Sequence, residues 1–404
     1  MEDGRTRISL PVREISIPED HPARKLQWVA GAIGLLFLVL SLIAGYGDLR
    51  QFFFSYLVAY LFFLSVGLGG LIFVLIQFVT RAGWSVAVRR LAENVMGTLP
   101  FMTVLVIPLL FGLDQLFLWF DSQVIEKDLI LQQKVAFLNP GFFYVRTVIY
   151  LLGWAVIAWW FRKQSIRQDS GDSVEITRKL QMVSAPAIAW FAVTATFFSF
   201  DWIMSLDPHW YSTIFGVYFF AGCMIAILST LILMVLALQR HDLLLNIVSE
   251  EHFHDLGKLL FGFVVFWAYI AFSQFMLIWY ANIPEETIWF AHRLQHGWEH
   301  VSFLLAAGHF VLPFFLLLSR NSKRKRTVLV GATLWLLAMH YVDLYWLVMP
   351  SFQAEGLHPH WLDLTLLIGL GGLFLAGLLR LMAKPLLIPC RDPRLAESLS
   401  FENI

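Results

Sequence analysis

The sequence has little charge and almost no cysteine. Lys, Arg, Asp and Glu make up 14% of its 404 residues, and the 29 basic side chains balance the 29 acidic ones, so nothing indicates a nucleic-acid partner. The two cysteines, Cys223 and Cys390, stand far apart, which argues against a disulfide framework and against CxxC ligation of a metal or an iron–sulfur cluster. GxSxG, HExxH and Gly-rich phosphate-binding motifs are absent as well, so a nucleophilic enzyme is not expected.

Hydrophobic residues, in contrast, make up 58% of the chain. A helix needs roughly 20 apolar residues to cross the hydrocarbon core of a bilayer. The apolar runs are long and continuous, without the alternation of barrel strands, which predicts an all-α polytopic membrane protein with about ten transmembrane helices. The expected spans are 27–46, 52–79, 95–120, 141–161, 183–204, 211–238, 257–281, 298–319, 327–349 and 361–383.

The segments outside these spans predict the orientation of the chain. Residues 1–26 are polar and lack the apolar core of a signal peptide, so we expect a retained tail before the membrane domain at 27–383 and a second tail at 384–404. All but five of the 29 Lys and Arg fall on the side that holds both tails. By the positive-inside rule, both termini are expected in the cytoplasm. The basic residues on the outer side are Arg50, Lys127, Lys134, Arg146 and Arg293.

Ionisable residues within the spans are candidates for function. Each costs roughly 2.5 to 3.5 kcal/mol at mid-helix on insertion scales, so each suggests a partner, a cavity or a role. They concentrate in the outer halves of the spans, and the inner halves are expected to hold almost none, which predicts a proton-accessible region opening to the outer face. Contact with outer water or with a partner subunit explains the shallower ones equally well. The candidates for proton transfer are Asp114, His309, His340 and Asp343, followed by Asp201 and His209.

Two cofactor sites are conceivable but less favoured. His292, His296 and His300 recur at helical spacing beside Glu299, as metal ligands can, yet they open at the membrane edge, where a solvated rim is the simpler interpretation. His309 and His340 are the single candidate pair for the axial ligands of a haem. We therefore expect no metal, haem or iron–sulfur cluster on this chain.

A family resemblance rests on the segment from Ser199 to Gly222. It contains the run Asp-Trp-Ile-Met-Ser-Leu-Asp-Pro-His-Trp at 201–210, which is a helix end followed by a tight, aromatic-rich outer turn. This run closely resembles the hallmark segment of the F subunit of bacterial alternative complex III, one of the polysulfide-reductase membrane-anchor (NrfD-like) proteins. The residues that carry the resemblance are Asp201, Trp202, Asp207, Pro208, His209 and Trp210.

The resemblance implies a fold, a location and partners. It implies two four-helix bundles, at about 52–204 and 211–349, with the first and last spans peripheral. It also implies a place in the bacterial cytoplasmic (inner) membrane, within a respiratory quinol:electron-acceptor oxidoreductase complex. The implied partners are a multihaem cytochrome, an iron–sulfur protein, a paralogous NrfD-like subunit and lipids, and quinone or quinol is the implied ligand.

Three functions remain open from the sequence. In the first, the chain contributes to quinol interaction, to proton conduction near the outer face, or to both. In the second, it is a secondary transporter or proton-translocating module, although inverted repeats and broken midplane helices are not evident. In the third, it is a structural anchor that docks extrinsic redox subunits through its outer loops at 121–139 and 282–300.

Overall fold

The computed structural model describes residues 12–170 and 173–403, and these form helices and no strand. Ten membrane spans are present among them, as the hydropathy of the sequence predicts. They are α2 (Pro22–Gly45), α3 (Leu49–Val79), the segmented third span α4 (Val86–Met96), α5 (Leu99–Leu105) and α6 (Ile107–Leu110), α10 (Pro140–Gln168), α11 (Ser173–Trp202), α12 (Phe215–Gln239), α13 (Glu250–Ala281), the segmented eighth span α15 (Trp298–Leu304), η3 (Leu305–Val311) and α16 (Leu312–Leu318), α17 (Arg326–Val348) and α18 (Trp361–Met382). The protein is therefore an all-α, multi-pass membrane protein.

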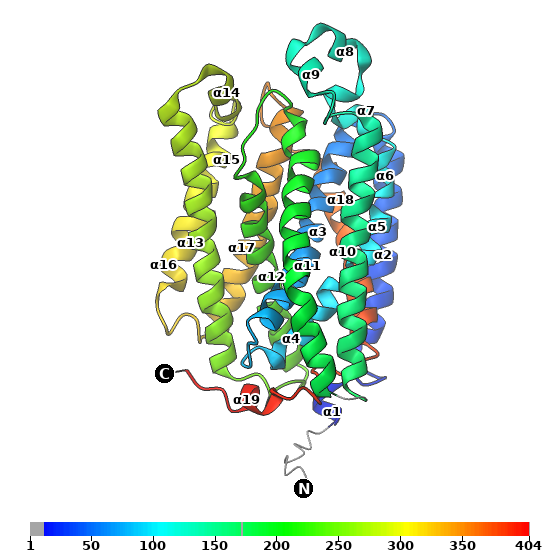
Figure 1. Cartoon of the computed structure of the whole chain (residues 1–404), viewed down its shortest axis with the longest axis vertical. Coiled ribbons are helices and arrows are strands. Elements are labelled where there is room, and N and C mark those ends of the chain that lie inside the picture. Colours follow the sequence, from blue (N-terminus) through cyan, green and yellow to red (C-terminus); the bar gives the residue numbers. More distant parts are fainter. Residues whose placement is uncertain (1–11, 171–172, 404) are drawn as a thin grey trace.

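The spans form two four-helix bundles whose central helices are α3 and α12 (Figure 1). In their most apolar stretches, 83% of α3 and 78% of α12 is buried, against 22% of the peripheral α2. The third span, α10 and α11 complete the bundle of α3, while α13, the eighth span and α17 complete that of α12. The bundles meet where α3 packs on α12, so a polar group on either central helix is shielded from lipid.

Helices α2 and α18 lie outside the two bundles and pack closely on each other. A Cβ atom added to Gly34 of α2 would lie 2.7 Å from the backbone nitrogen of Leu373 and 2.8 Å from the carbonyl oxygen of Gly369 on α18. Only glycine allows two helix backbones to approach so closely. The glycine-rich run of α18 thus serves helix packing.

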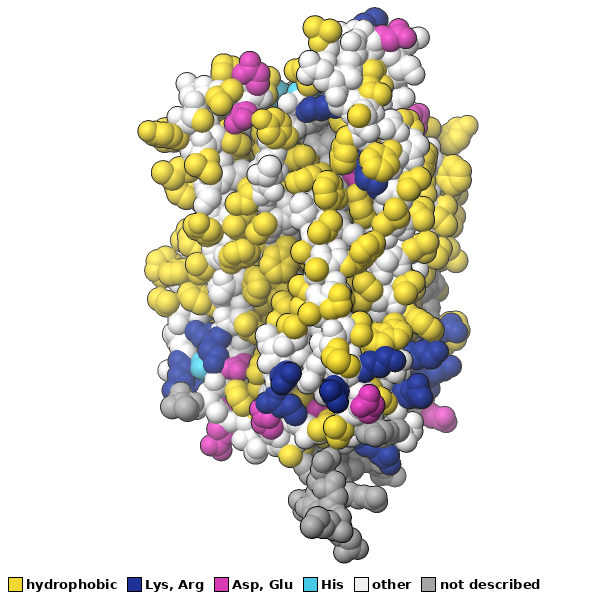
Figure 2. Space-filling view, in the orientation of Figure 1, with side chains coloured by type: hydrophobic (Ala, Val, Ile, Leu, Met, Phe, Trp, Pro, Cys, Tyr) yellow, Lys and Arg dark blue, Asp and Glu magenta, His cyan; other side chains and the backbone are white. Residues whose placement is uncertain are grey.

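Both described ends of the chain lie at the same end of the bundles, here called the terminal end (Figure 1). Lys and Arg side chains gather at this end, below a broad hydrophobic band (Figure 2). The predicted tail at 384–404 is docked there, with Leu387, Ile388 and Leu395 buried, whereas residues 1–11 of the other predicted tail lie outside the described residues. Short helices cover the opposite end; they are α8 (Ser122–Lys127), α9 (Leu129–Lys134) and α14 (Pro284–His292).

The third span differs from its predicted bounds of 95–120, because it begins at Val86 and ends at Leu110. Pro100 and Pro108 lack the N–H that a continuous helix needs, and each lies in the first turn of a later piece, α5 or α6. Asp114, predicted inside this span, lies beyond it on the four-residue α7 (Leu113–Leu116) with an exposed side chain. Its expected depth in the membrane is therefore wrong.

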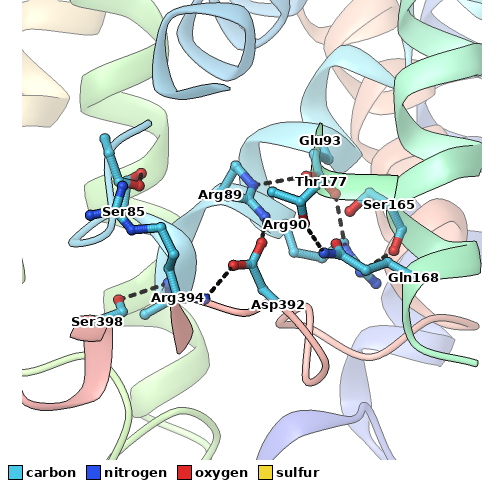
Figure 3. A network of polar contacts seen from close by, with 12 residues as sticks. Ser85, Arg89, Arg90, Glu93, Ser165, Gln168, Thr177, Asp392, Arg394 and Ser398 are labelled. Carbon is cyan, nitrogen blue, oxygen red and sulfur yellow. Dashed lines mark hydrogen bonds and ion pairs between the residues drawn. The ribbon is translucent and has the colours of Figure 1, made fainter. Parts of the chain in front are cut away.

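The early start of the third span also buries charge at the terminal end (Figure 3). Arg89 and Arg90 of α4 contact Glu93 at 3.3 Å and 3.0 Å, and all three are almost completely buried. Arg89 reaches Asp392 of the C-terminal segment at 2.5 Å, and Arg90 reaches Asp169 at the end of α10 at 2.9 Å. The expectation that this half of the spans holds almost no polar groups is wrong, because pairing allows the charges to be buried.

Candidate functional site

Asp343 of α17 lies at the centre of a buried polar cluster in the second bundle. The hydroxyl of Tyr218, on α12, donates a hydrogen bond to one carboxylate oxygen. The indole Nε1 of Trp267, on α13, donates to the other oxygen at 3.2 Å. Three helices thus converge on a carboxylate that is 1% exposed, and its hydrogen-bond partners are both neutral.

His309 lies against this cluster on the eighth span. Its ring packs on the Trp267 ring with 4.0 Å between centroids. The side chain is fully buried, and neither ring nitrogen has a hydrogen-bond partner among the described residues. Unsatisfied polar atoms in a membrane core are costly and need an explanation, so they mark a place where a proton or a polar ligand can bind.

The backbone around His309 is a π-helical turn, η3, within an otherwise α-helical span. Pro313, four residues after His309, has no N–H to donate to the His309 carbonyl, which favours a wider turn at this point. The Gly308 carbonyl instead accepts a hydrogen bond from the Trp335 indole of α17 at 2.7 Å. Such turns often occur at functional sites.

His340 continues the cluster toward the first bundle. It lies one turn before Asp343 on α17, and its Nε2 is 2.8 Å from the hydroxyl of Ser65 on α3. Since that hydroxyl donates its proton to the carbonyl of Phe62 at 2.7 Å, it accepts from His340, which places the ring proton on Nε2. The Nδ1 atom of His340 is buried without a partner among the described residues. The structure therefore brings His309, His340 and Asp343 together.

A pocket of about 550 Å³ adjoins this cluster between α12, α13, α14, the eighth span and α17. Tyr218 and Trp267 line it, and these same side chains bind Asp343. Its lining is mainly aromatic and aliphatic, with Gln274, Glu299 and Ser302 toward the opposite end. Phe272 and Phe303, which also line it, are 61% and 74% exposed on the hydrophobic outer surface, so the pocket opens toward lipid. The remaining lining residues are Ala268, Ala271, Phe275, Phe290, Leu294, Leu305, Ala306, Phe310, Val311 and Trp346.

Asp201 does not join this cluster. In the first bundle, its carboxylate accepts hydrogen bonds from Nε and Nη2 of Arg146 at 2.8 Å and 2.7 Å and from the Tyr150 hydroxyl at 3.0 Å. Its neighbour Trp202 donates to the Thr147 hydroxyl at 3.1 Å. Asp201 is therefore one half of a buried ion pair that ties α11 to α10.

The rest of the 201–210 motif fastens the loops of the opposite end. The Pro208 carbonyl accepts from Lys134 at 2.6 Å, His209 lies 2.5 Å from Asp128, and Trp210 stacks on Trp289 with 4.3 Å between ring centroids. The hydrogen bond from His209 lowers the pKa of Asp128, while burial lowers the pKa of Lys134 against the opposing effects of Asp207 and Asp128. The exposed His209 and Asp114 both lie away from Asp343, and the Asp114 carboxylate accepts from Gln115.

Arg293, for which the sequence predicts only a place on the outer side, is a further buried residue beside the pocket. Its guanidinium donates to the carbonyls of Trp289, Trp346 and Leu347 at 3.0 to 3.2 Å, and it lies 3.5 Å from the centre of the Trp289 ring. Burial lowers the pKa of Arg293 to about 9. Arg293 caps the last carbonyls of α17 and thereby positions Trp346, which lines the pocket.

The proposed helical row of histidines is not formed. Helix α14 ends at His292, and His296 has a φ of 56° in the following turn, so His292, His296 and His300 do not share one helical face. Within residues 12–170 and 173–403, no group of three or more His, Cys, Asp or Glu side chains is arranged to hold a metal ion.

The cluster and its pocket combine an apolar cavity open to lipid with buried groups that can exchange a proton. Tyr218 and Trp267 were missed in the sequence because aromatic residues occur throughout the spans, at 16% of the chain. Comparison of the sequence with models of known families and with curated proteins returned no match. The chemistry of the site must therefore be judged from its own residues.

Proposed function

We propose that this chain is the membrane subunit of a respiratory quinol:electron-acceptor oxidoreductase complex and that its lipid-facing pocket binds the quinol head group. The observation that carries the proposal is a pocket of about 550 Å³ whose floor residues, Tyr218 and Trp267, both donate hydrogen bonds to the buried Asp343. Quinols are dissolved in the bilayer, so their binding site needs a lateral entrance, and the exposed Phe272 and Phe303 border one.

The pocket supplies what oxidation of a quinol requires. Each quinol loses two electrons and two protons, and a proton acceptor beside its hydroxyl group lowers the barrier. Tyr218 can take up a proton from the quinol while passing its own to Asp343, because its hydroxyl already donates to that carboxylate. The two electrons pass to a haem or an iron–sulfur cluster on a partner subunit.

The buried histidines extend this role to proton conduction. His309 has two ring nitrogens without a partner among the described residues and His340 has one, so both can accept a proton. His340 contacts Ser65 on the central helix of the first bundle, and His309 packs on Trp267, which donates a hydrogen bond to Asp343. This arrangement supports a path from the pocket toward the bundle interface.

The 201–210 motif supports membership of the NrfD-like family as an F-type subunit of alternative complex III. In that assignment the complex lies in the bacterial cytoplasmic membrane, the terminal end faces the cytoplasm, and the pocket lies in the outer half of the bilayer. The partners are a multihaem cytochrome, an iron–sulfur protein and a paralogous membrane subunit. Helices α8 and α9 project beyond the bundles and expose Leu129 and Ile130, which suits the docking of an extrinsic subunit (Figure 1).

Photolabelling of the purified complex with an azido-ubiquinone tests the pocket directly. We expect crosslinks in peptides from α13 and the eighth span of this chain. Ala271→Trp fills the pocket and is expected to remove most of the labelling, whereas Ala192→Trp, on the exposed face of α11, serves as the matched control. Because the label is mapped to this chain, a quinone site on a paralogous subunit does not obscure the result.

Tyr218→Phe separates binding from proton transfer. The variant keeps the aromatic wall but loses the hydroxyl that links the pocket to Asp343. We expect labelling close to wild type with a quinol turnover lowered by roughly 100-fold, the usual scale of general acid–base catalysis. Unchanged labelling in Ala271→Trp would overturn the pocket assignment. Full turnover in Tyr218→Phe would overturn the proton-transfer step.

A further inference from the structure

A second cavity lies in the terminal half of the molecule, between the third span, α10 and α18. Its volume is about 550 Å³, and it adjoins a smaller one of about 230 Å³ that shares Gly97, Arg162 and Leu381 with it. The argument rests on four cations and two apolar residues of the lining. They are Arg162, Lys163, Arg380 and Lys384, and Phe101 and Ile166.

The cations at this cavity have no ion-pair partner in the described part of the chain. Arg162, Lys163, Arg380 and Lys384 form no ion pair with any residue in the described part of the chain. The nearby Arg89 and Arg90 of the third span are, in contrast, fully paired with carboxylates. The cavity cations therefore differ from Arg89 and Arg90, which have carboxylate partners. This difference indicates that a negative charge for the cavity cations comes from outside the chain.

Arg162 is held in place with part of its guanidinium unused. Its Nε donates to Asn94 at 3.1 Å and its Nη2 donates to the carbonyl of Leu381 at 2.7 Å. Its Nη1 makes no hydrogen bond to the described residues. Gly97 makes room for the side chain, because a Cβ atom there would lie 2.9 Å from Cδ of Arg162. The chain thus fixes a cation at the wall of the cavity and leaves one donor group for a ligand.

The other part of the cavity is apolar. Phe101, Ile166 and Leu381 line it, and Gly377 opens it, because a Cβ atom there would come no closer than 3.7 Å to Phe101. A group of cations beside an apolar cleft matches the two chemical halves of a phospholipid.

We propose that this cavity binds an anionic phospholipid, with the phosphate at Arg162, Arg380 and Lys384 and an acyl chain along Phe101 and Leu381. The bound lipid neutralises these cations and joins α18 to α10 and the third span. A soluble phosphate ion leaves the apolar cleft unexplained. An acidic peptide does not match the apolar lining formed by Phe101, Ile166 and Leu381. The site is separate from the quinol pocket and does not depend on the function proposed for that pocket.

Native mass spectrometry of the full-length protein, titrated with dioleoylphosphatidylglycerol or dioleoylphosphatidylcholine, tests this site. We expect tighter retention of phosphatidylglycerol and roughly 10- to 30-fold weaker binding in Arg380→Gln/Lys384→Gln, the effect of removing two cations near the phosphate. Arg320→Gln/Lys325→Gln removes the same charge from exposed positions at the same end and is expected to bind like wild type. Equal loss in both double variants, or in neither, overturns the proposal.

Gly377→Leu gives a second, steric test that leaves every cation in place. The leucine fills the cleft beside Phe101, and we expect it to weaken retention of phosphatidylglycerol by a factor similar to that of the charge variant. Size-exclusion profiles in detergent show whether each variant is folded. If the charge variant does not fold, lipid retention in Gly377→Leu tests whether the cavity binds the lipid. Undiminished lipid retention in Gly377→Leu overturns the acyl-chain assignment. Displacement of the lipid by millimolar inorganic phosphate would identify a phosphate ion as the ligand and overturn the lipid.

Discussion

Asp343 and Asp201 represent two ways of keeping a carboxylate inside a membrane protein. Asp201 is neutralised by a bidentate contact with Arg146, so protonating it would leave a buried guanidinium unpaired. Asp343 has neutral partners, Tyr218 and Trp267, so it can gain or lose a proton without breaking an ion pair. This difference supports a structural role for Asp201 and the proton-transfer role proposed for Asp343.

Replacing each carboxylate by an amide tests this distinction. Asp343→Asn is expected to assemble normally and to lower quinol turnover by roughly 100-fold, because the proton acceptor is lost. Asp201→Asn is expected to lower the stability of the protein by about 3 to 5 kcal/mol, since Arg146 remains buried without its counter-ion. Turnover of the purified complex and its thermal unfolding measure the two effects. Wild-type turnover in assembled Asp343→Asn would contradict the assignment.

Depth in an apolar run was sufficient to predict from the sequence that His309, His340 and Asp343 lie inside the membrane domain, while their role in proton transfer stays a prediction. It could not show that Asp201 belongs to a different cluster, because the partner Arg146 lies on another helix and was known only as a basic residue of the outer side. Hydrogen-bond partners such as Tyr218 cannot be predicted from the sequence either, because nothing in the sequence distinguishes an aromatic residue that binds a carboxylate from one that only packs. Single residues are therefore predictable here, and their pairings are not.

At the scale of elements, the informative positions are those where a span is not a regular helix. The third span is segmented at Pro100 and Pro108, and the eighth span widens into η3 before Pro313. Hydropathy is averaged over a window longer than such local breaks. It therefore predicts the eighth span but not the π-helical turn η3 within it. The proline four residues after His309 is the sequence signal that could have indicated it.

Pro313→Ala tests whether the π-helical turn positions His309. Alanine restores the N–H that can bond to the His309 carbonyl, which favours a regular α-helix and rotates the histidine away from Trp267. We expect a fold that is at least as stable, with turnover lowered roughly 10- to 100-fold by the displaced side chain. Pro108→Ala, in the first bundle, is the matched control for loss of a proline from a span. Equal turnover in the two variants would show that the turn has no functional role.

At the scale of the whole molecule, span number and fold class follow from the sequence because both depend on local hydropathy. The start of the third span does not follow from the sequence. A segment that carries Arg89, Arg90 and Glu93 looks like a polar loop as long as the partners of these charges are unknown. Asp392 lies in the C-terminal segment, far from these residues in sequence, so the sequence does not reveal its ion pair with Arg89. Buried charge networks therefore limit what hydropathy can predict.

The orientation of the bundles decides whether the proposed quinol pocket faces the outer side of the membrane. Labelling of single cysteines can determine this orientation. In a protein with Cys223 and Cys390 replaced by alanine, Leu129→Cys reports on the opposite end and Lys325→Cys on the terminal end, since both positions are exposed. Because Lys and Arg gather at the terminal end, the positive-inside rule predicts that this end faces the cytoplasm. In right-side-out spheroplasts we expect an impermeant maleimide to label Leu129→Cys at once and Lys325→Cys only after permeabilisation. The reverse pattern would place the pocket in the cytoplasmic half of the bilayer, where Asp343 would release its proton to the wrong side for quinol oxidation at the outer face.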